Sequence, residues 1–191
     1  IDSAMRLRYK VFKQRLGWEV TTQGDQERDQ FDSLPDTLYI LHIGTHGEVD
    51  GCIRLLPTMG PNMLRDVFPI LLEDKKAPCS PNIWECSRFA VAQDNLSQPG
   101  LITARLLDAM YELGTLYGFN SIVAVTDLLV EKLLRKYGTS AKRIGNIHQI
   151  GVTKAVAAYY QTNLKTLAQL RTYSGFSSSQ IYVAPWIREA A

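Results

Sequence analysis

Charged side chains interrupt two strand-like apolar runs of this chain, and this feature restricts the folds that it can adopt. Arg54 lies within the run 52–56, and Glu85 and Arg88 lie within the run 83–91. Burying an ionised group without a partner is strongly unfavourable. These runs can therefore form half-buried strands only if oppositely charged side chains from distant parts of the sequence reach them.

The polar segment 23–32, followed by Pro35, supplies carboxylates that can serve as partners. It lacks periodicity, so we expect an extended loop that carries Asp29 and Asp32. A third cation, Arg8, lies beside the apolar stripe of a predicted N-terminal helix. The numbers of positive and negative side chains are equal: three cations, Arg8, Arg54 and Arg88, and three carboxylates, Asp29, Asp32 and Glu85. A buried structural network and a functional site both account for this balance.

Hydrophobic periodicity and Gly and Pro punctuation predict the other elements. Helices are predicted at residues 5–16, 63–72, 102–117, 128–137 and 164–170, with Met5, Tyr9, Phe12 and Leu16 on one face of the first. Strands are predicted at residues 38–43, 49–56, 83–91, 122–126, 143–149, 155–161 and 180–184. With 191 residues and 46% hydrophobic content, the chain can bury one substantial core. We predict one domain, residues 1–191, of the α/β (α+β) class, with a mixed, mostly antiparallel twisted sheet flanked by helices.

Composition argues against several classes of protein. No apolar stretch of about 18 residues is present to span a bilayer. The three cysteines form no C-x-x-C pair and have no His at ligand spacing, so no metal site is expected. Plain thiols and the lack of a basic-then-apolar leader indicate a cytoplasmic protein. Neither a GxxxxGK[ST] nor a GxGxxG loop is present, which argues against a nucleotide-phosphate cradle.

The formal net charge of +2 is unevenly distributed, because no acidic residue lies between Glu131 and Glu189. A field of one sign attracts acidic partners, which include nucleic acid, anionic lipid and acidic proteins. The basic residues that open this stretch are Lys132, Arg135, Lys136, Lys142 and Arg143. The first three fall on one helical face, so they can dock an acidic helix. An ordinary solvated surface is the alternative.

Six ordered motifs carry a resemblance to a known family. They are Arg8-x-x-x-Phe12, Arg15-Leu16-Gly17-Trp18, Asp29-Gln30-Phe31-Asp32, Arg54-Leu55-Leu56-Pro57-Thr58, Met63-Leu64-x-Asp66-x-Phe68-Pro69 and Trp84-Glu85-x-Ser87-Arg88-Phe89-x-Val91. In order and spacing they resemble the first half of the acyl-homoserine-lactone synthases, or autoinducer synthases; the second half of the chain matches loosely. Members of this family begin upstream of the position matched by Ile1, so we expect a short preceding segment.

The resemblance implies a fold like that of the N-acetyltransferases and a reaction that makes quorum-sensing signals. The α-amine of S-adenosyl-L-methionine attacks an acyl thioester carried by acyl carrier protein or, in some members, by coenzyme A. The substrate carboxylate then closes a lactone ring and expels methylthioadenosine. No metal or redox cofactor is implied, because S-adenosyl-L-methionine is itself a substrate.

Within that reaction, the residue types suggest roles for the segment around Glu85. The amine needs a general base, and Glu85 is the candidate, with Ser87 positioning a water molecule. Arg88 completes the catalytic group as an organiser of charge. Backbone N–H groups between Phe89 and Ala92 are candidates to meet the oxyanion.

The positions that match the family's substrate-binding residues are Arg8, Phe12, Trp18, Asp29, Asp32, Arg54, Phe68, Phe89 and Thr126. Phe12 and Trp18 can pack on the adenine or the sulfonium, and Phe68 more simply packs in the core. By resemblance, Thr126 lies where family members discriminate the third carbon of the acyl chain. Core packing explains most of the apolar residues around it equally well.

Two rival functions remain. A general N-acyltransferase of the acetyltransferase superfamily would use acyl-coenzyme A, but residues 92–100 contain one Gly and no basic residue to hold its pyrophosphate. A nucleic-acid-binding module would explain the basic half and leave Arg54, Glu85 and Arg88 unexplained. The favoured partners are S-adenosyl-L-methionine and an acidic acyl carrier protein, with neither nucleic acid nor a membrane span.

Overall fold

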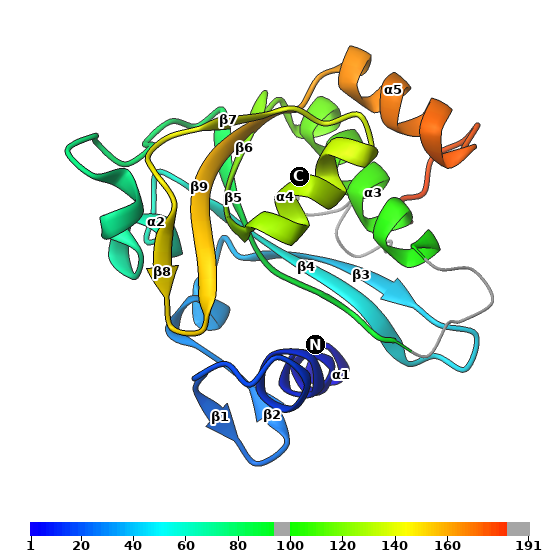
Figure 1. The fold of residues 1–191 in the computed structure, drawn as a ribbon. Helices are drawn as coiled ribbons and strands as arrows, with labels where there is room; N and C mark the ends of the chain where they lie inside the picture. Colours follow the sequence, from blue (N-terminus) through cyan, green and yellow to red (C-terminus); the bar gives the residue numbers. More distant parts are fainter. Residues whose placement is uncertain (94–99, 183–191) are drawn as a thin grey trace.

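The computed structural model describes residues 1–93 and 100–182, and its main feature is a seven-stranded sheet (Figure 1). The strand order is β3-β4-β5-β6-β9-β7, and β8 also pairs with β9. The strands are β3 (Leu38–Ile43), β4 (Val49–Pro57), β5 (Ile83–Val91), β6 (Ser121–Asp127), β7 (Ala141–Arg143), β8 (His148–Ile150) and β9 (Thr153–Gln161). Only β5 and β6 run parallel. The predicted mixed, mostly antiparallel twisted sheet is confirmed.

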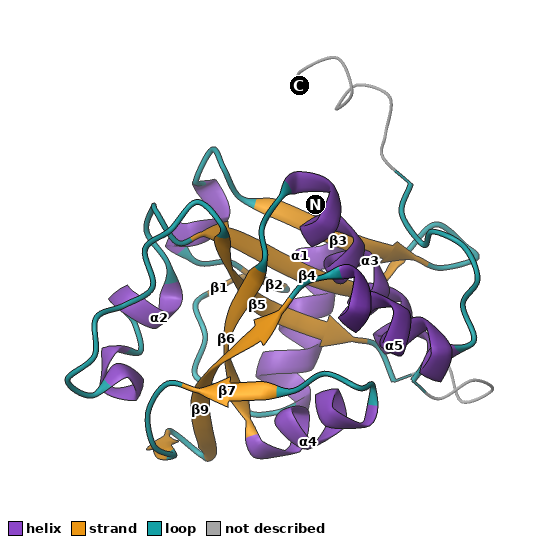
Figure 2. Cartoon of the chain, turned by 90° about the horizontal axis from the view of Figure 1, so that it is seen from above, coloured by secondary structure: helices purple, strands orange, loops and turns teal. Residues whose placement is uncertain are grey.

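Helices cover both faces of the sheet (Figures 1 and 2). The α3 face carries α3 (Leu101–Tyr117), α4 (Leu128–Lys136) and α5 (Leu164–Ser174); the α1 face carries α1 (Asp2–Arg8), the π-helix η1 (Tyr9–Arg15), α2 (Met63–Asp66) and the 3₁₀ turn η3 (Pro69–Leu72). Side chains alternate between these faces. Ile53 and Leu55 pack in the cluster with α3, whereas Cys52 packs with α1. Arg54 therefore points to the α1 face.

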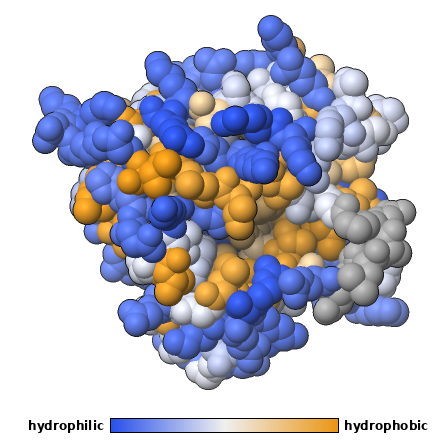
Figure 3. All heavy atoms as spheres, viewed as in Figure 1, coloured by the Kyte–Doolittle hydropathy of each residue, from blue (hydrophilic) through white to orange (hydrophobic). Residues whose placement is uncertain are grey.

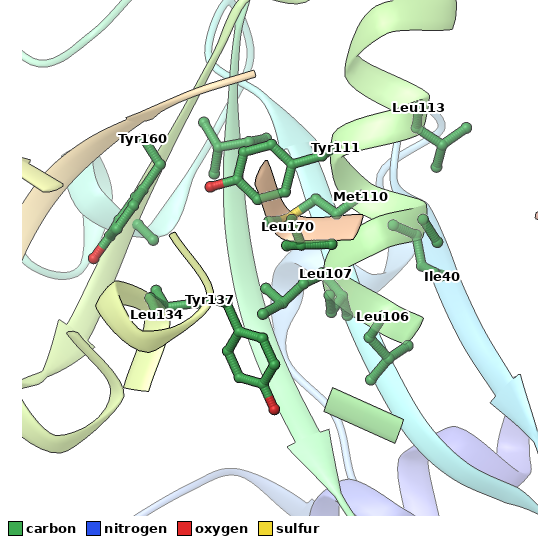
Figure 4. Packing of buried hydrophobic residues seen from close by; sticks show 14 of the residues in the cluster. Ile40, Leu106, Leu107, Met110, Tyr111, Leu113, Leu134, Tyr137, Tyr160 and Leu170 are labelled. Carbon is green, nitrogen blue, oxygen red and sulfur yellow. The ribbon is translucent and has the colours of Figure 1, made fainter. Parts of the chain in front are cut away.

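The largest apolar cluster lies on the α3 face, and Figure 4 shows part of it. Leu107, Met110 and Tyr111 of α3 reach toward the sheet, and Leu134 of α4 and Tyr160 of β9 meet them there. Burial of each such side chain contributes about 1.5–3 kcal/mol before entropy is counted. This cluster fixes α3 and α4 against the sheet.

The first helix confirms part of the predicted stripe. Met5 and Phe12 are buried, but Leu16 is exposed, so its placement on the buried face was wrong. The physical reason is the change from α- to π-helix after Arg8, because a π-helix has more residues per turn and shifts the phase of later side chains. Gly17 ends the helix at a φ of +66°.

Other predicted elements need correction. The helix 63–72 is interrupted at Phe68, because Pro69 starts a separate turn. The strand 143–149 is wrong, since β7 and β8 are separated by a bend where a Cβ on Gly145 would lie 2.5 Å from the Leu71 carbonyl oxygen. Residues 180–182 are not in a strand, and the rest of the predicted strand 180–184 lies outside the described residues.

The loop 23–32 also contains regular structure. Strands β1 (Thr22–Gln23) and β2 (Gln26–Glu27) form a two-stranded hairpin, and the 3₁₀ turn η2 spans Gln30–Ser33. Within residues 1–93 and 100–182, no helix has the length and apolar content needed to cross a membrane.

Candidate active site

A buried network of three arginines and three carboxylates lies on the α1 face. Arg8 has no exposed surface, and its Nε donates to Glu27 Oε2 at 2.5 Å. Its two terminal nitrogens donate to the two oxygens of Asp32 at 2.7 and 2.9 Å. Asp32 is held by a capping box in η2, where it accepts the N–H of Asp29 and Asp29 accepts that of Phe31. The local turn thus presents both aspartates to the arginines.

Arg54 joins the network from the middle of β4. Its terminal nitrogens donate to the Asp29 carboxylate at 2.5 and 3.0 Å, and one of them also donates to Asp32 at 2.6 Å. Its Nε donates to the Ser87 hydroxyl at 3.1 Å. The guanidinium lies 5.5 Å from the centre of the Phe31 ring, a cation–π contact. Every face of this buried cation therefore has a partner.

Arg88 closes the network from β5. It lies 3.0 Å from Glu27 Oε1 and 2.7 Å from Asp29 Oδ2. Its guanidinium also lies 5.7 Å from the centre of the Phe12 ring. Arg88 thus connects the network to Phe12 of η1.

The network corrects one predicted partner. Its third carboxylate is Glu27, which is fully buried, and Glu85 makes no ion pair with the arginines among the described residues. Glu27 was missed because segment 23–32 looked irregular. Its position in the β1–β2 hairpin is the missing information, because that turn directs Glu27 inward.

Electrostatics hold the network in its charged form. Burial alone would raise the pKa of Asp32, but the bonds and charges of Arg8 and Arg54 lower it well below its usual range. Burial would likewise lower the pKa of Arg8, and Asp32 and Glu27 raise it instead. Tyr39 donates to Asp32 at 2.5 Å, and burial together with that carboxylate raises the pKa of Tyr39. These groups stay ionised or protonated across the physiological range.

Glu85 occupies a different environment on the same face. It is 1% exposed and accepts the backbone N–H groups of Met63 at 2.8 Å and Leu64 at 2.6 Å. It thereby caps the N-terminus of α2. Burial raises its pKa to about 6, and the two backbone bonds limit this rise. Glu85 is thus a carboxylate that changes charge near neutral pH, as general bases commonly do.

A β-bulge at Arg88 opens the sheet beside Glu85. Ser87 pairs with Arg54 and Ala90 with Cys52, so two residues of β5 oppose Ile53 alone. Arg88 has a φ of +52°, which side-chain-bearing residues rarely adopt. The parallel pairing of β5 and β6 covers only Ile83–Cys86 and Ser121–Ala124. From Ser87 and Val125 onward the two strands are no longer paired.

A pocket of about 800 Å³ passes through the sheet at this separation. From the α1 face it is lined by Phe12, Trp18, Asp29, Glu85 and Arg88, and from the α3 face by Leu107, Met110, Tyr111, Leu134 and Tyr160. Figure 3 shows the hollow, with apolar side chains gathered in and beside it. One half of the pocket is therefore charged and aromatic, and the other half is apolar.

Most of the predicted substrate-binding residues line this pocket. Phe12 and Trp18 stack with ring centres 5.2 Å apart and planes within 4° of parallel. Phe68, Phe89 and Thr126 also line it, Thr126 at the end where β6 meets α4. Phe68 packs in two apolar clusters as well, in agreement with a packing role.

Three predicted substrate-binding residues lie behind the pocket wall. Arg8, Asp32 and Arg54 do not line the pocket, and all three are buried in the ion network. They reach the lining residues through the network, because Arg54 bonds Asp29, and Arg8 and Arg88 share Glu27. Ser87 does line the pocket, and its hydroxyl is held by Arg54.

The predicted docking residues lie at the surface around α4 and β7. Lys132, Arg135 and Lys136 are exposed on α4, and Lys142 is exposed on β7. Arg143 pairs with Glu131 at 2.6 Å, which offsets part of its charge. The structure thus brings to one region of the molecule the four cations of this group that make no ion pair with another described residue. Within the described ranges, no group of His, Cys, Asp and Glu is arranged to hold a metal ion.

Comparison with known proteins agrees with this architecture. A family model described as autoinducer synthase matches residues 1–170. An acyl-homoserine-lactone synthase from Vibrio anguillarum is 38% identical over 166 residues, covering 84% of this chain and 86% of the relative.

Two solved structures are informative in different ways. BjaI, a CoA-dependent acyl-homoserine lactone synthase solved with SAM and isopentyl-CoA, matches with a TM-score of 0.85 and 27% identity, covering 93% of this chain and 83% of BjaI. A putative N-acetyltransferase from Lactobacillus plantarum matches with a TM-score of 0.58 and 14% identity, covering 84% of this chain and 90% of that protein. The second match shows a shared fold alone, which confirms the predicted likeness to N-acetyltransferases. The chain therefore belongs to the autoinducer synthase family and is an enzyme of the acyl-homoserine-lactone synthase type.

Proposed function

We propose that the enzyme makes an N-acyl-L-homoserine lactone from S-adenosyl-L-methionine and an acyl thioester carried by acyl carrier protein. The observation that carries this proposal is the pocket that crosses the sheet where β5 and β6 separate. Its charged half suits a polar, cationic substrate, and its apolar half suits a fatty acyl chain. The two substrates then meet at the bulge between the two halves.

The charged half offers groups that match S-adenosyl-L-methionine. The stacked Phe12 and Trp18 rings provide a surface for the adenine or the sulfonium. Arg88 can attract the substrate carboxylate, and Asp29 can attract its ammonium. Arg8, Arg54 and Asp32 are positioning residues, because their bidentate bonds leave the lining residues little freedom to move.

Amide formation needs a base and an oxyanion site. Glu85, through water positioned by Ser87, accepts a proton from the amine as the nitrogen attacks the thioester carbonyl. The C–N bond forms, the C–S bond breaks, and the leaving thiolate takes the proton that Glu85 accepted from the nitrogen. The N–H groups from Phe89 to Val91 adjoin the bulge, where the irregular strand pairing can turn a donor toward the tetrahedral oxyanion. The predicted range also included Ala92, but its N–H donates to the Asp50 carbonyl at 2.8 Å.

Lactone formation uses a second displacement within the same substrate. A carboxylate oxygen attacks the carbon attached to the sulfonium, forming the ring C–O bond. The C–S bond breaks, and neutral methylthioadenosine leaves with the electron pair. The sulfonium is an excellent leaving group, so the enzyme's contribution is to hold the chain folded. No metal or redox cofactor enters this proposal.

The acyl half suggests how the donor is chosen. We propose that Thr126, which lines the pocket at the end of β6, contacts the third carbon of the acyl chain. The exposed cations Lys132, Arg135, Lys136 and Lys142 suit an acidic carrier protein. We place the reaction in the cytoplasm, where reduced cysteines persist. BjaI shows that a protein of this fold can instead be CoA-dependent, so the donor must be tested.

The test is incubation with S-adenosyl-L-methionine and one acyl donor, either an acyl-carrier-protein thioester or an acyl-coenzyme A. Mass spectrometry should detect methylthioadenosine and an acyl-homoserine lactone in equal amounts. Absence of both with every donor would contradict the proposed reaction. Higher kcat/KM with acyl-coenzyme A would contradict the choice of carrier protein alone.

Charge reversal tests the docking surface. The triple variant Lys132→Glu, Arg135→Glu, Lys136→Glu should lower kcat/KM for the carrier-protein donor by about 10-fold or more, and leave a small acyl-pantetheine thioester unaffected. The matched control reverses Arg6, Lys10 and Lys13, which are exposed on α1 and η1 and change the net charge equally. Equal losses in both triple variants would remove the docking assignment.

A further inference from the structure

Tyr160 places a polar atom in the apolar half of the pocket. It lies on β9 opposite Ile122 of β6, and only 2% of its surface is exposed. It shares the pocket lining with Met110, Tyr111 and Leu134. Figure 4 shows its ring extending from the sheet toward the helix that carries Leu134. The hydroxyl therefore lies in a mainly apolar part of the pocket, and the charges of Glu131 and Arg143 are near enough to shift its pKa in opposite directions.

This hydroxyl has no hydrogen-bond partner among the residues that the structure describes. The same is true of the Thr126 hydroxyl, which is also buried and lines the same pocket. Tyr160 and Thr126 lie on adjacent strands and point to the same face, because Ile122 is the register partner of Tyr160 and Thr126 lies four residues further along β6. Two unpaired hydroxyls thus converge on one part of the pocket.

Buried polar groups are normally hydrogen-bonded, so each exception needs an explanation. Burial raises the pKa of Tyr160 to about 12, and the nearby Thr126 hydroxyl offsets part of that rise. The phenol is therefore protonated at neutral pH and can donate. A saturated acyl chain in this pocket would leave both hydroxyls unpaired, whereas an oxygen on the chain would satisfy one or both.

We propose that Tyr160 is a specificity-determining residue, whose hydroxyl donates a hydrogen bond to an oxygen substituent on the acyl chain. The enzyme then prefers oxygen-bearing acyl donors to saturated donors of equal length. The inference rests on the proposed function, and it adds a second hydroxyl, from β9, to the contact proposed for Thr126. A keto oxygen accepts from both hydroxyls, and a hydroxyl substituent can accept from one and donate to the other.

The experiment compares kcat/KM for matched pairs of saturated and oxo-acyl thioesters, equal in length and on the same carrier. The wild-type enzyme should favour the oxo donor. Tyr160→Phe should reduce the oxo-to-saturated ratio by about 3- to 10-fold, the usual effect of one neutral hydrogen bond. Turnover of the saturated donor should persist, because the ring that packs the pocket is retained. The thermal midpoint should not fall, since the hydroxyl has no partner to lose.

Tyr159→Phe is the matched control. Tyr159 is the adjacent residue on β9, but it packs in the cluster of the α1 face with Val123 and does not line this pocket. The same atom is removed there, so the oxo-to-saturated ratio should remain at the wild-type value. A ratio that falls equally in both variants would overturn the assignment.

Thr126→Val tests whether the two hydroxyls contact one oxygen. If they do, the effects of Thr126→Val and Tyr160→Phe on the ratio will not add, because contacting residues are coupled. This inference alone is overturned if the active wild-type enzyme uses the oxo and saturated donors equally. It is also overturned if Tyr160→Phe keeps the wild-type oxo-to-saturated ratio. Failure of wild type to release methylthioadenosine with any donor overturns the proposed function, and the inference with it.

Discussion

The two faces of the sheet are stabilised by different forces, although one pocket connects them. On the α1 face, three arginines and three carboxylates hold one another through bidentate bonds. On the α3 face, apolar side chains from α3, α4 and β9 pack without fixed directions. Directional bonds keep reacting groups in place, whereas apolar packing tolerates changes of shape and size. In the function that we propose, the chemistry therefore takes place on the α1 face and the acyl chain is selected on the α3 face.

The largest effect should come from breaking the ion network. Arg54→Met leaves the buried carboxylates of Asp29 and Asp32 short of a partner, so the free energy of unfolding should fall by about 3–5 kcal/mol. Urea denaturation measures this loss, and activity should fall with it because the pocket wall moves. A fall below about 1 kcal/mol would show that the network does not stabilise this face.

Arg65→Met is the matched control. Arg65 also pairs with an aspartate, Asp66, but this pair is partly exposed to solvent. Solvent screens such pairs, so the same substitution should change the free energy of unfolding by about 0–1 kcal/mol. The two variants together separate the effect of burial from the effect of losing one arginine.

The second effect tests whether Glu85 acts in the reaction or only caps α2. Glu85→Gln should lower kcat by about 100-fold. Its amide oxygen still accepts a backbone N–H bond, and a neutral group avoids the cost of burial, so stability should change by about 1 kcal/mol at most. Stopped assays of methylthioadenosine release, beside urea denaturation, measure both quantities.

Asn62→Ala controls for the helix itself. Asn62 caps α2 by accepting the N–H of Arg65, so its loss should cost about 1 kcal/mol of stability. Its side chain has no titratable group, so kcat should change little. If loosening α2 in this way lowers kcat as far as Glu85→Gln does, the role of Glu85 is structural.

The third effect is a pH dependence specific to Glu85. Its pKa of about 6 in the folded protein lies above the ordinary value of 4.5. The base form is populated above about pH 6, so kcat should fall about tenfold for each pH unit below it. Glu85→Gln should abolish this slope, and a slope that survives the substitution must come from another group.

Stability should follow the opposite trend. Because the pKa of Glu85 is raised in the folded protein, this group contributes about 2 kcal/mol to the free energy of unfolding. That contribution is fully present below pH 4.5 and is lost as the pH rises through about 6. Asp32 has the opposite effect on stability. Its pKa is lowered in the folded protein, so its contribution to stability is present above its ordinary pKa and is lost as the pH falls through the folded value. Urea titrations of wild type and Glu85→Gln at pH 5 and pH 7.5 separate the two.

The α1 face could be predicted from the sequence better than the α3 face. Charges inside apolar strands are conspicuous, so Arg54 and Arg88 could be recognised and partners sought in the loop that carries Asp29 and Asp32. The role of Glu27 in the network was not predicted, because its inward direction depends on the β1–β2 turn. The change of buried face at η1 was not predicted either, because nothing in the spacing of Phe12 and Leu16 distinguishes a π-helical turn from an α-helical turn.

The α3 face carries no comparable signal. Tyr111 and Tyr160 look like ordinary core residues in sequence, and only three-dimensional contact shows that they line a pocket. The left-handed backbone of Arg88 is equally hidden, because a glycine is expected at such a φ and the ion pairs compensate for its strain. Tertiary contacts decide these features, so local patterns cannot reveal them.

The smallest effect compares two tryptophans on opposite faces. Trp18 stacks on Phe12 in the charged half of the pocket, whereas Trp84 stacks on Phe119 at 5.5 Å in the α3-face cluster. Trp18→Leu should raise KM for S-adenosyl-L-methionine about 3- to 10-fold with kcat nearly unchanged, because a binding surface of about 0.5–1.5 kcal/mol is lost. Trp84→Leu should leave that KM unchanged and lower the free energy of unfolding by about 1–3 kcal/mol. Initial-rate kinetics and urea denaturation of both variants distinguish the outcomes. A KM that rises equally in Trp84→Leu would mean that the two faces are coupled, and the division of chemistry and packing between them would then fail.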